Sequence, residues 1–237
     1  MLLTLIPLIG LVLADVPPND VGAGPQPSPV PVSWELEFEY LDPRRIEVLV
    51  PGATMPEKFW YMVYTVRNNT GRTQRFFPTF ELVTEGIRVI ETDLGIHPLV
   101  FDAIRQRHNA THKYLVSPTK AIGDLRVGDD NAIESVAIWR ADDSDVNSFR
   151  VFVAGLSGET AIVLNPTRGK SKATAEVNAD EKPAAAATAP SDKPKGASDS
   201  RRFTLRKTLE IQYDLPGSHS GRTTAEPERK SVRWIMR

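Results

Sequence analysis

Hydrophobic and polar residues alternate along much of the chain with a period of two, the pattern of a strand with one buried face. In residues 34–40, WELEFEY, aromatic and leucine side chains fall on one face and glutamates on the other. A second alternating run at residues 46–50 follows the turn-forming pair Asp42 and Pro43. We therefore expect the two runs to form an antiparallel hairpin.

Residues 59–66, FWYMVYTV, are apolar on both alternating faces. This pattern predicts a strand in the middle of a sheet, covered on both sides. A surface on which aromatic side chains stack against sugars or bases is the alternative, but β-branched and aromatic enrichment is ordinary for interior strands. Polar residues 67–71 predict a turn, and residues 76–84 the returning strand, with Pro78 indicating an edge or a bulge because it has no N–H.

A single helix is expected within this pattern of strands. Pro98 suits a first helical position, and residues 99–107 contain no glycine or proline. An apolar face made by Leu99, Phe101, Ala103 and Ile104 predicts that the helix caps an open end of a sandwich. Further strands are expected at residues 135–139, 149–154, 160–164, 203–213 and 231–235.

These elements predict a mainly β fold, an antiparallel immunoglobulin-like β-sandwich with one short helix and a disordered loop insertion. The predicted single domain covers residues 32–237. The insertion is placed at residues 167–200, which have no aromatic residue and only one branched aliphatic, Val177. A segment with so little apolar surface cannot offset its conformational entropy by burial. Residues 15–31 are rich in proline and glycine and are predicted to be a linker.

The first residues predict export. Residues 1–13, MLLTLIPLIGLVL, are too few to cross a bilayer, which takes about 20 apolar residues. They fit the apolar region of a signal peptide at residues 1–14, with Val12 and Ala14 as the small residues before cleavage and Asp15 as the mature N-terminus. An uncleaved hydrophobic anchor is the alternative. We expect a periplasmic, cell-surface or extracellular protein with no stable transmembrane segment after signal cleavage.

Composition narrows the possible chemistry. The chain has no cysteine, which excludes disulfides and thiolate zinc sites. It has 29 Lys and Arg against 30 Asp and Glu, for a formal net charge of -1. Strong attraction to nucleic acid or to an anionic membrane needs a basic imbalance, so no nucleic-acid partner is expected.

Calcium is the one cofactor for which the sequence offers ligands. Asp143, Asp145 and Asn147 match the alternating oxygen ligands that open an EF-hand loop, but Ser148 and Ala154 stand where glycine and a bidentate glutamate are needed. The EF-hand is therefore excluded. A different calcium site, with ligands added from Asp129, Asp130 or Asp142, remains open beside the interpretation of these residues as polar turns.

Catalytic signatures are incomplete. His108 and His112 have the spacing of zinc ligands, but the glutamate of the metalloprotease motif and a third ligand are missing, and an exposed loop is expected. Ser157 lies between glycines in GLSGE without the spacing of a hydrolase elbow, so this stretch predicts a hairpin turn. Nothing in the sequence brings His97 and Asp102 to Ser157 as a triad.

Two Asn-X-Thr patterns match glycosylation acceptors, Asn68 with Thr70 and Asn109 with Thr111. In a bacterial chain they are interpreted as turn residues.

One resemblance rests on YTVRNNTG at residues 64–71 followed by RFFPTFELVT at residues 75–84. Together with LGIHPLVFDAIRQRH, GDDNAIESVAIW and VFVAGLSGET, these stretches make the chain similar to secreted proteins of planctomycete-type bacteria that have no assigned function. The resemblance covers about residues 34–164 and the C-terminal strands. It implies an immunoglobulin-like sandwich and no particular activity or functional residue.

The function expected from these observations is that of an exported, non-enzymatic β-sandwich protein with a binding or structural role at the cell envelope. Its partner would be another envelope protein or a polysaccharide. The alternative is a periplasmic hydrolase or metal-dependent enzyme whose site is assembled from loops. The absence of a complete catalytic motif favours the first expectation.

Overall fold

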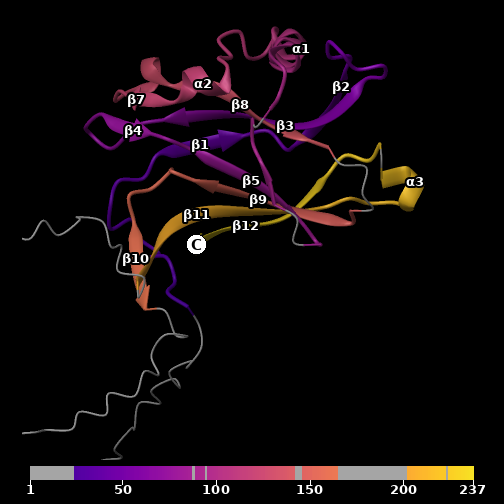
Figure 1. Ribbon diagram of the computed structural model, residues 1–237. Coiled ribbons are helices and arrows are strands. Elements are labelled where there is room, and N and C mark those ends of the chain that lie inside the picture. The colour runs from indigo at the N-terminus through magenta and orange to yellow at the C-terminus, as the bar shows by residue number, and fades with distance from the viewer. Residues whose placement is uncertain (1–23, 87–88, 94, 142–145, 165–201, 223) are drawn as a thin grey trace, which may run out of the picture.

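The computed structural model describes residues 24–86, 89–93, 95–141, 146–164, 202–222 and 224–237 (Figure 1). In these residues two antiparallel β-sheets pack face to face, and a helix covers the outer face of one of them (Figure 1). The elements are β1 (Glu37–Tyr40), β2 (Arg44–Val48), β3 (Glu57–Arg67), β4 (Gln74–Phe76), β5 (Thr79–Thr84), β6 (Val89–Glu91), α1 (Pro98–His108), α2 (Pro118–Ala121), β7 (Gly123–Leu125), the 3₁₀ turn η1 (Asp129–Asn131), β8 (Ile133–Arg140), β9 (Ser148–Ala154), β10 (Thr160–Leu164), β11 (Arg202–Asp214), α3 (His219–Arg222) and β12 (Glu228–Met236).

The first sheet contains four strands, with β1, β2 and β8 all paired with β3. The second contains six, in the order β10-β11-β9-β5-β6 with β12 paired with β11, and β4 and β7 form a separate pair. All pairs are antiparallel. The predicted mainly β, antiparallel sandwich is therefore confirmed, while the immunoglobulin-like relationship stays a prediction.

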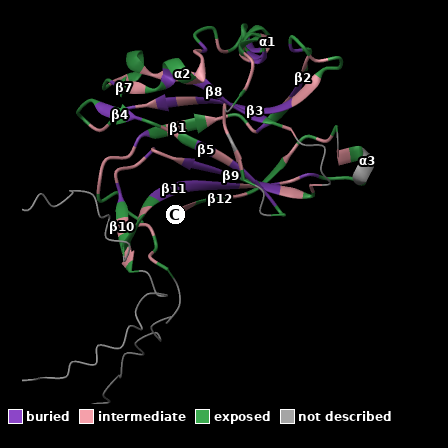
Figure 2. Ribbon diagram, viewed as in Figure 1, coloured by how far each residue is buried: buried purple, intermediate pink, exposed green. Residues whose placement is uncertain are grey.

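The strand β3 lies at the centre of the first sheet and is buried on both faces (Figure 2). Trp60, Met62, Tyr64 and Val66 face the core between the two sheets. On the opposite face, Phe59, Tyr61 and Val63 pack against α1 in a second core. This confirms the prediction, made from its two apolar faces, that residues 59–66 form an interior strand.

The two strands before β3 do not form the predicted hairpin. Both pair with β3 along the same edge, because β8 occupies the other one. Tyr40 pairs with Tyr64, and Arg44 pairs with Tyr61. The edge therefore advances four residues while β3 advances three. The expected turn at Asp42 and Pro43 is thus a bulge within one interrupted edge strand, at a proline that has no N–H to contribute to the ladder.

The predicted strand at residues 76–84 is divided at Pro78. Its first part, β4, pairs with β7, and its second part, β5, crosses to the second sheet and pairs with β6 and β9. The expectation that these residues return beside β3 is therefore wrong. The proline interrupts the ladder, as its missing N–H predicts, and the chain changes sheets there.

Two strands of the second sheet, β9 and β10, each pair with β11, so GLSGE between them is not the predicted hairpin turn. Gly155 has a φ of 89°, and a Cβ there would lie 2.5 Å from the carbonyl oxygen of Phe77. A Cβ at Gly158 would lie 2.3 Å from Nε1 of Trp34. Both positions require glycine because the excursion packs closely against neighbouring segments.

The predicted insertion at residues 167–200 lies outside the described residues. On either side of it, Leu164 pairs with Arg202 in the β10–β11 ladder. Residues 1–14, the predicted signal peptide, also lie outside the described part. Of the predicted linker, residues 24–31 are described and contain no helix or strand. Within them, Ser28 donates its backbone N–H to Glu159 at 2.7 Å, so this part of the tract contacts the domain.

The helix α1 begins at Pro98, as predicted, but covers the outer face of the first sheet and does not cap an open end (Figure 1). Its buried residues are Val100, Ile104 and His108, spaced four apart along one face. Leu99, expected on the apolar face, is 43% exposed. Because His108 is polar, the sequence did not identify this face of the helix as the buried one. Two four-residue helices, α2 and α3, and the strands β6 and β7 were not predicted.

Replacing Trp60 with alanine tests the burial of β3. Trp60 is 7% exposed, and its ring lies 5.3 Å from that of Phe149. We expect the free energy of unfolding to fall by about 3 to 5 kcal/mol, because transfer energy is lost and a cavity remains. Denaturant unfolding followed by circular dichroism measures the change. The control Leu49→Ala removes an exposed side chain and should alter stability by less than about 0.5 kcal/mol. Unchanged stability in Trp60→Ala would contradict the placement of this strand.

Candidate functional site

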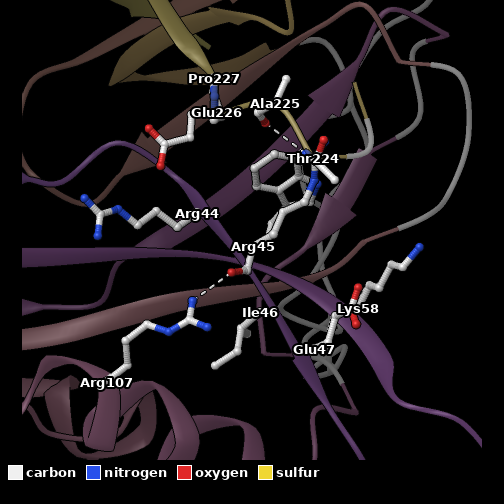
Figure 3. A pocket seen from close by; sticks show the side chains of 11 residues that line it. Arg44, Arg45, Ile46, Glu47, Lys58, Arg107, Thr224, Ala225, Glu226 and Pro227 are labelled. Carbon is white, nitrogen blue, oxygen red and sulfur yellow. Dashed lines mark hydrogen bonds between the residues drawn. The ribbon is translucent and has the colours of Figure 1, made fainter. Parts of the chain in front are cut away.

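A groove of about 690 Å³ runs along β2, the edge strand of the first sheet (Figure 3). Residues 224–227, which lead from α3 into β12, form its other side. It is lined by Arg44, Arg45, Ile46, Glu47, Lys58, Trp60, Arg107, Thr224, Ala225, Glu226 and Pro227. Four of these side chains are cationic and two are carboxylates, so the groove has a positive formal charge.

Arg45 connects the two sides of this groove. Its guanidinium carbon lies 4.1 Å from the centre of the Trp60 ring, a cation–π contact across the β2–β3 pair. Its Nη1 donates a hydrogen bond of 2.9 Å to the carbonyl of Ala225 (Figure 3). The Trp60 ring therefore packs in the core on one side and contacts Arg45 in the groove on the other.

Arg107 reaches the same groove from the last turn of α1. Its Nη1 donates to the carbonyl of Arg45 at 2.9 Å and to the hydroxyl of Tyr61 at 3.3 Å. Arg44 is exposed and, within the described residues, has no hydrogen-bond or ion-pair partner. Figure 3 shows its side chain between those of Glu226 and Arg107. Its five guanidinium N–H donors are thus available to a ligand.

His108 lies behind these cations and is buried, not in the exposed loop that the sequence predicts. Its Nε2 and the Tyr61 hydroxyl are 3.1 Å apart. Burial lowers the pKa of His108, and the nearby positive charges of His112, Arg44 and Arg107 lower it further. The imidazole is therefore neutral at pH 7 and supports Tyr61 as a packing and hydrogen-bonding group.

His112 follows α1, with its ring centre 5.6 Å from that of His108. Its Nδ1 is 2.9 Å from Oγ1 of Thr111. Among the described residues, no group of three or more histidine, aspartate or glutamate side chains is arranged to hold a metal ion.

A second groove, of about 1010 Å³, crosses the outer face of the first sheet beside β1. It contains two of the calcium candidates, Asp129 and Asp130. A third candidate, Asn147, lies beyond the opposite end of β8 and donates to Glu85 at 3.1 Å. The eight residues of β8 span roughly 25 Å, so these candidates do not share a site. Asp142, Asp143 and Asp145 lie outside the described residues.

The residues considered for a triad each have a local role. Ser157 Oγ accepts the backbone N–H of Glu159 at 3.2 Å. His97 caps α1 by accepting the backbone N–H of Leu99, and Asp102 pairs with Arg105 at 3.0 Å. Ser157 belongs to the second sheet's excursion, whereas α1 covers the outer face of the first sheet. The structure does not bring these residues together.

The two glycosylation patterns also occupy structural positions. Asn68 is fully buried and donates to the carbonyl oxygens of Leu125 and Arg72 at 2.7 and 2.9 Å. Its Oδ1 accepts the backbone N–H of Thr70, which fixes the turn after β3. Asn109 is the C-cap of α1.

A buried ionic cluster, which sequence reasoning missed, attaches the N-terminal segment to the second sheet. Lys207 is 3% exposed, with its Nζ 2.8 Å from Glu35 and 3.4 Å from Glu159. Burial opposes its charge, but the hydrogen bonds and charges of both glutamates outweigh this effect and raise the pKa of Lys207. The backbone N–H of Ser28 lowers the pKa of Glu159, and Lys207 lowers it further. The period-two pattern places Lys207 on a strand but gives no sign of its partners.

Asp93 is the carboxylate whose environment perturbs it most clearly. It has a φ of 61°, and its Oδ1 is buried without a hydrogen-bond partner. Burial raises the pKa of Asp93 to about 6, although a 2.8 Å hydrogen bond from Thr92 acts in the opposite direction. Neither groove described above is lined by Asp93. Its strain and desolvation therefore indicate a cost to stability and no recognisable chemistry.

Asp93→Asn tests this cost through its pH dependence. Between about pH 4 and pH 6 the unfolded chain releases the Asp93 proton while the native state keeps it, so stability falls as pH rises. We expect Asp93→Asn to be more stable than the wild type by roughly 2 to 3 kcal/mol at pH 7, and by much less at pH 4. Asparagine tolerates the positive φ. Denaturant unfolding at the two pH values measures this, with Asp124→Asn as an exposed control. An equal effect of Asp93→Asn at both pH values would contradict the assignment.

The sequence indicates only part of this groove. Arg44 and Arg45 are adjacent, but Arg107 and residues 224–227 lie far from them along the chain.

No helix among the described residues is long and apolar enough to span a membrane. Comparison with known proteins gives no further guide, because no family model, no curated protein and no solved structure matches the chain.

Proposed function

We propose that this chain is an exported, non-enzymatic β-sandwich protein that binds an anionic ligand at the cell envelope. The groove along β2 is the binding site, and an acidic polysaccharide is the class of ligand. The observation that carries the proposal is the convergence of four cationic side chains from β2, β3 and α1 on one groove.

The arrangement of these cations favours recognition of carboxylates. Arginine presents planar, forked donors that match a carboxylate in a bidentate geometry. Arg45 and Arg107 are held in place by Trp60 and Tyr61, so they lose little conformational entropy on binding. Arg44 is exposed beside them and can close on a ligand. A linear polysaccharide with repeated carboxylates would contact these groups in succession along the edge strand.

The shape of the site also fits a polymer. The groove follows successive residues of β2 and is open to solvent, so a polysaccharide chain can lie along it and extend beyond it.

The residues that the sequence offered as catalytic candidates give indirect support to a non-enzymatic role. Ser157, His97 and Asp102 act as local hydrogen-bonding groups, and neither groove is lined by any of them.

Binding of polygalacturonate, which carries one carboxylate per sugar, tests the site. We expect the wild type to bind it, to bind neutral dextran undetectably, and to lose affinity as salt is added because the charges are screened. Arg44→Ala should weaken polygalacturonate binding about twofold to fivefold, since an exposed ionic contact contributes up to about 1 kcal/mol. Arg44→Lys keeps the positive charge but loses the forked donors. Its affinity for polygalacturonate should therefore lie between those of the wild type and Arg44→Ala.

The matched control is Arg75→Ala, because the Arg75 side chain is 80% exposed on β4 and lies outside the groove. It should bind polygalacturonate like the wild type. Isothermal titration calorimetry gives the affinities. Equal losses in Arg44→Ala and Arg75→Ala would indicate nonspecific attraction and would contradict the groove as the site.

Export is tested by the N-terminus of the mature protein. Because Val12 and Ala14 have the positions of small residues before a cleavage site, we expect a chain that begins near Asp15 in the envelope or extracellular fraction of the native host. Mass spectrometry of the intact protein measures this. Recovery of a chain that retains Met1 in the soluble cytoplasmic fraction would sink the export part of the proposal.

A further inference from the structure

β1 and β2 together form one edge of the first sheet. Both strands pair with β3 on one side, and no second strand pairs with either of them among the described residues. Such an edge presents backbone groups to solvent, and soluble proteins commonly protect it with charged side chains. Here the net charge changes sign along the edge.

The β1 half is acidic. Glu37 and Glu39 have side chains that are 46% and 59% exposed, and Arg67 pairs with both. The adjoining groove on the outer face of the sheet also contains Asp129, Asp130 and Glu134, and Arg67 is the one cationic side chain in its lining.

The β2 half is basic on balance, because four cationic side chains outnumber two carboxylates there. The cations are Arg44, Arg45, Lys58 and Arg107, and the carboxylates are Glu47 and Glu226. The bulge separates the two halves. At the bulge, Leu41 is 37% exposed, and the charges change sign on either side of it.

We propose that a second copy of this chain docks on this edge about a two-fold axis close to Leu41. In this arrangement the edges run antiparallel, so the acidic half of each copy meets the basic half of the other. A two-fold contact uses one patch on both subunits and must therefore be self-complementary. The division of charge at the bulge satisfies this requirement, with both charge contacts made at once.

The charges also exclude the competing arrangement. If two edges met in parallel, Glu37 and Glu39 would face their own copies, and Arg44 would face Arg44 of the partner copy. Like charges placed opposite each other across a strand pair are destabilising. Opposite charges select the antiparallel orientation and speed the encounter, while the exposed leucine contributes apolar contact at the centre.

This inference goes beyond the proposed function but concerns the same cationic groove, because it assigns a second occupant to it. The carboxylates of the partner copy and those of a polysaccharide would both bind Arg44. A saturating anionic polymer should therefore dissociate the dimer, and dimer formation should reduce the apparent affinity for the polymer.

Charge exchange on the full chain tests the dimer. Sedimentation velocity at low salt should show a dimer that becomes monomeric as salt is added. Arg44→Glu places a carboxylate against Glu39 of the other copy at both contacts, and Glu39→Lys places an ammonium against Arg44 of the other copy. Each variant alone should therefore self-associate at least tenfold more weakly. An equimolar mixture of the two should form a heterodimer, because opposite charges again meet on both sides of the axis.

Arg75→Glu is the control, since it exchanges an exposed charge on β4 away from this edge, and it should remain dimeric. Thermal unfolding verifies that each variant is folded, and Glu37→Lys replaces Glu39→Lys if that variant is not. A wild type that stays monomeric at low salt would overturn the inference. So would a dimer that both charge exchanges leave intact, or a mixture that fails to associate.

Polygalacturonate binding separates this inference from the proposed function. If the wild type is monomeric but binds polygalacturonate through Arg44, the dimer is wrong and the proposed function stands. If the charge exchanges control dimer formation but Arg44→Ala binds polygalacturonate like the wild type, the dimer stands and the proposed ligand is wrong. Dissociation of the wild-type dimer by polygalacturonate, with dextran inactive, would support both.

Discussion

β3 is buried on both faces, and the layers around it follow from the need to cover them. One face carries Trp60, Met62 and Tyr64 and packs against the second sheet, while the other carries Phe59, Tyr61 and Val63 and packs against α1. A strand with a single apolar face would be covered by the second sheet alone. The second apolar face requires the helix, and the helix in turn brings Arg107 to the edge of the sheet. The burial of one strand thus positions a side chain of the candidate site.

The edge strand beside β3 shows how an interruption in a ladder can shape a surface. At the bulge the register moves by one residue, and Pro43 withdraws a donor from the ladder. Arg45 then lies opposite Trp60 and spans the gap to Ala225, while Arg44 stays exposed. The same bulge separates an acidic half of the edge from a basic half. A continuous strand with evenly mixed charges would offer neither a cationic groove nor a self-complementary edge.

The second sheet contains an interruption with a different result. The excursion between β9 and β10 passes so close to Phe77 and Trp34 that Gly155 and Gly158 cannot carry side chains. Its end supplies Glu159, which with Glu35 surrounds the buried Lys207. A buried cation with two carboxylates is weak evidence for extra stability, because desolvation offsets much of the attraction. Its clearer effect is positional, since it fixes where the N-terminal segment crosses the sheet.

The sequence by itself determined the elements that local pattern controls. Two apolar faces indicated that residues 59–66 are interior, period-two alternation identified most long strands, and Pro98 marked the start of the helix. These signals are local because side-chain direction depends only on the backbone geometry of the strand or helix. Pairing was not determined in this way. The tertiary structure decided that residues 34–50 form one interrupted edge, that the chain changes sheets at Pro78, and that His108 faces the core. The candidate site was hidden for the same reason. Its cations come from β2, β3 and α1, and only the packing of α1 and of residues 224–227 around β2 brings them to one groove.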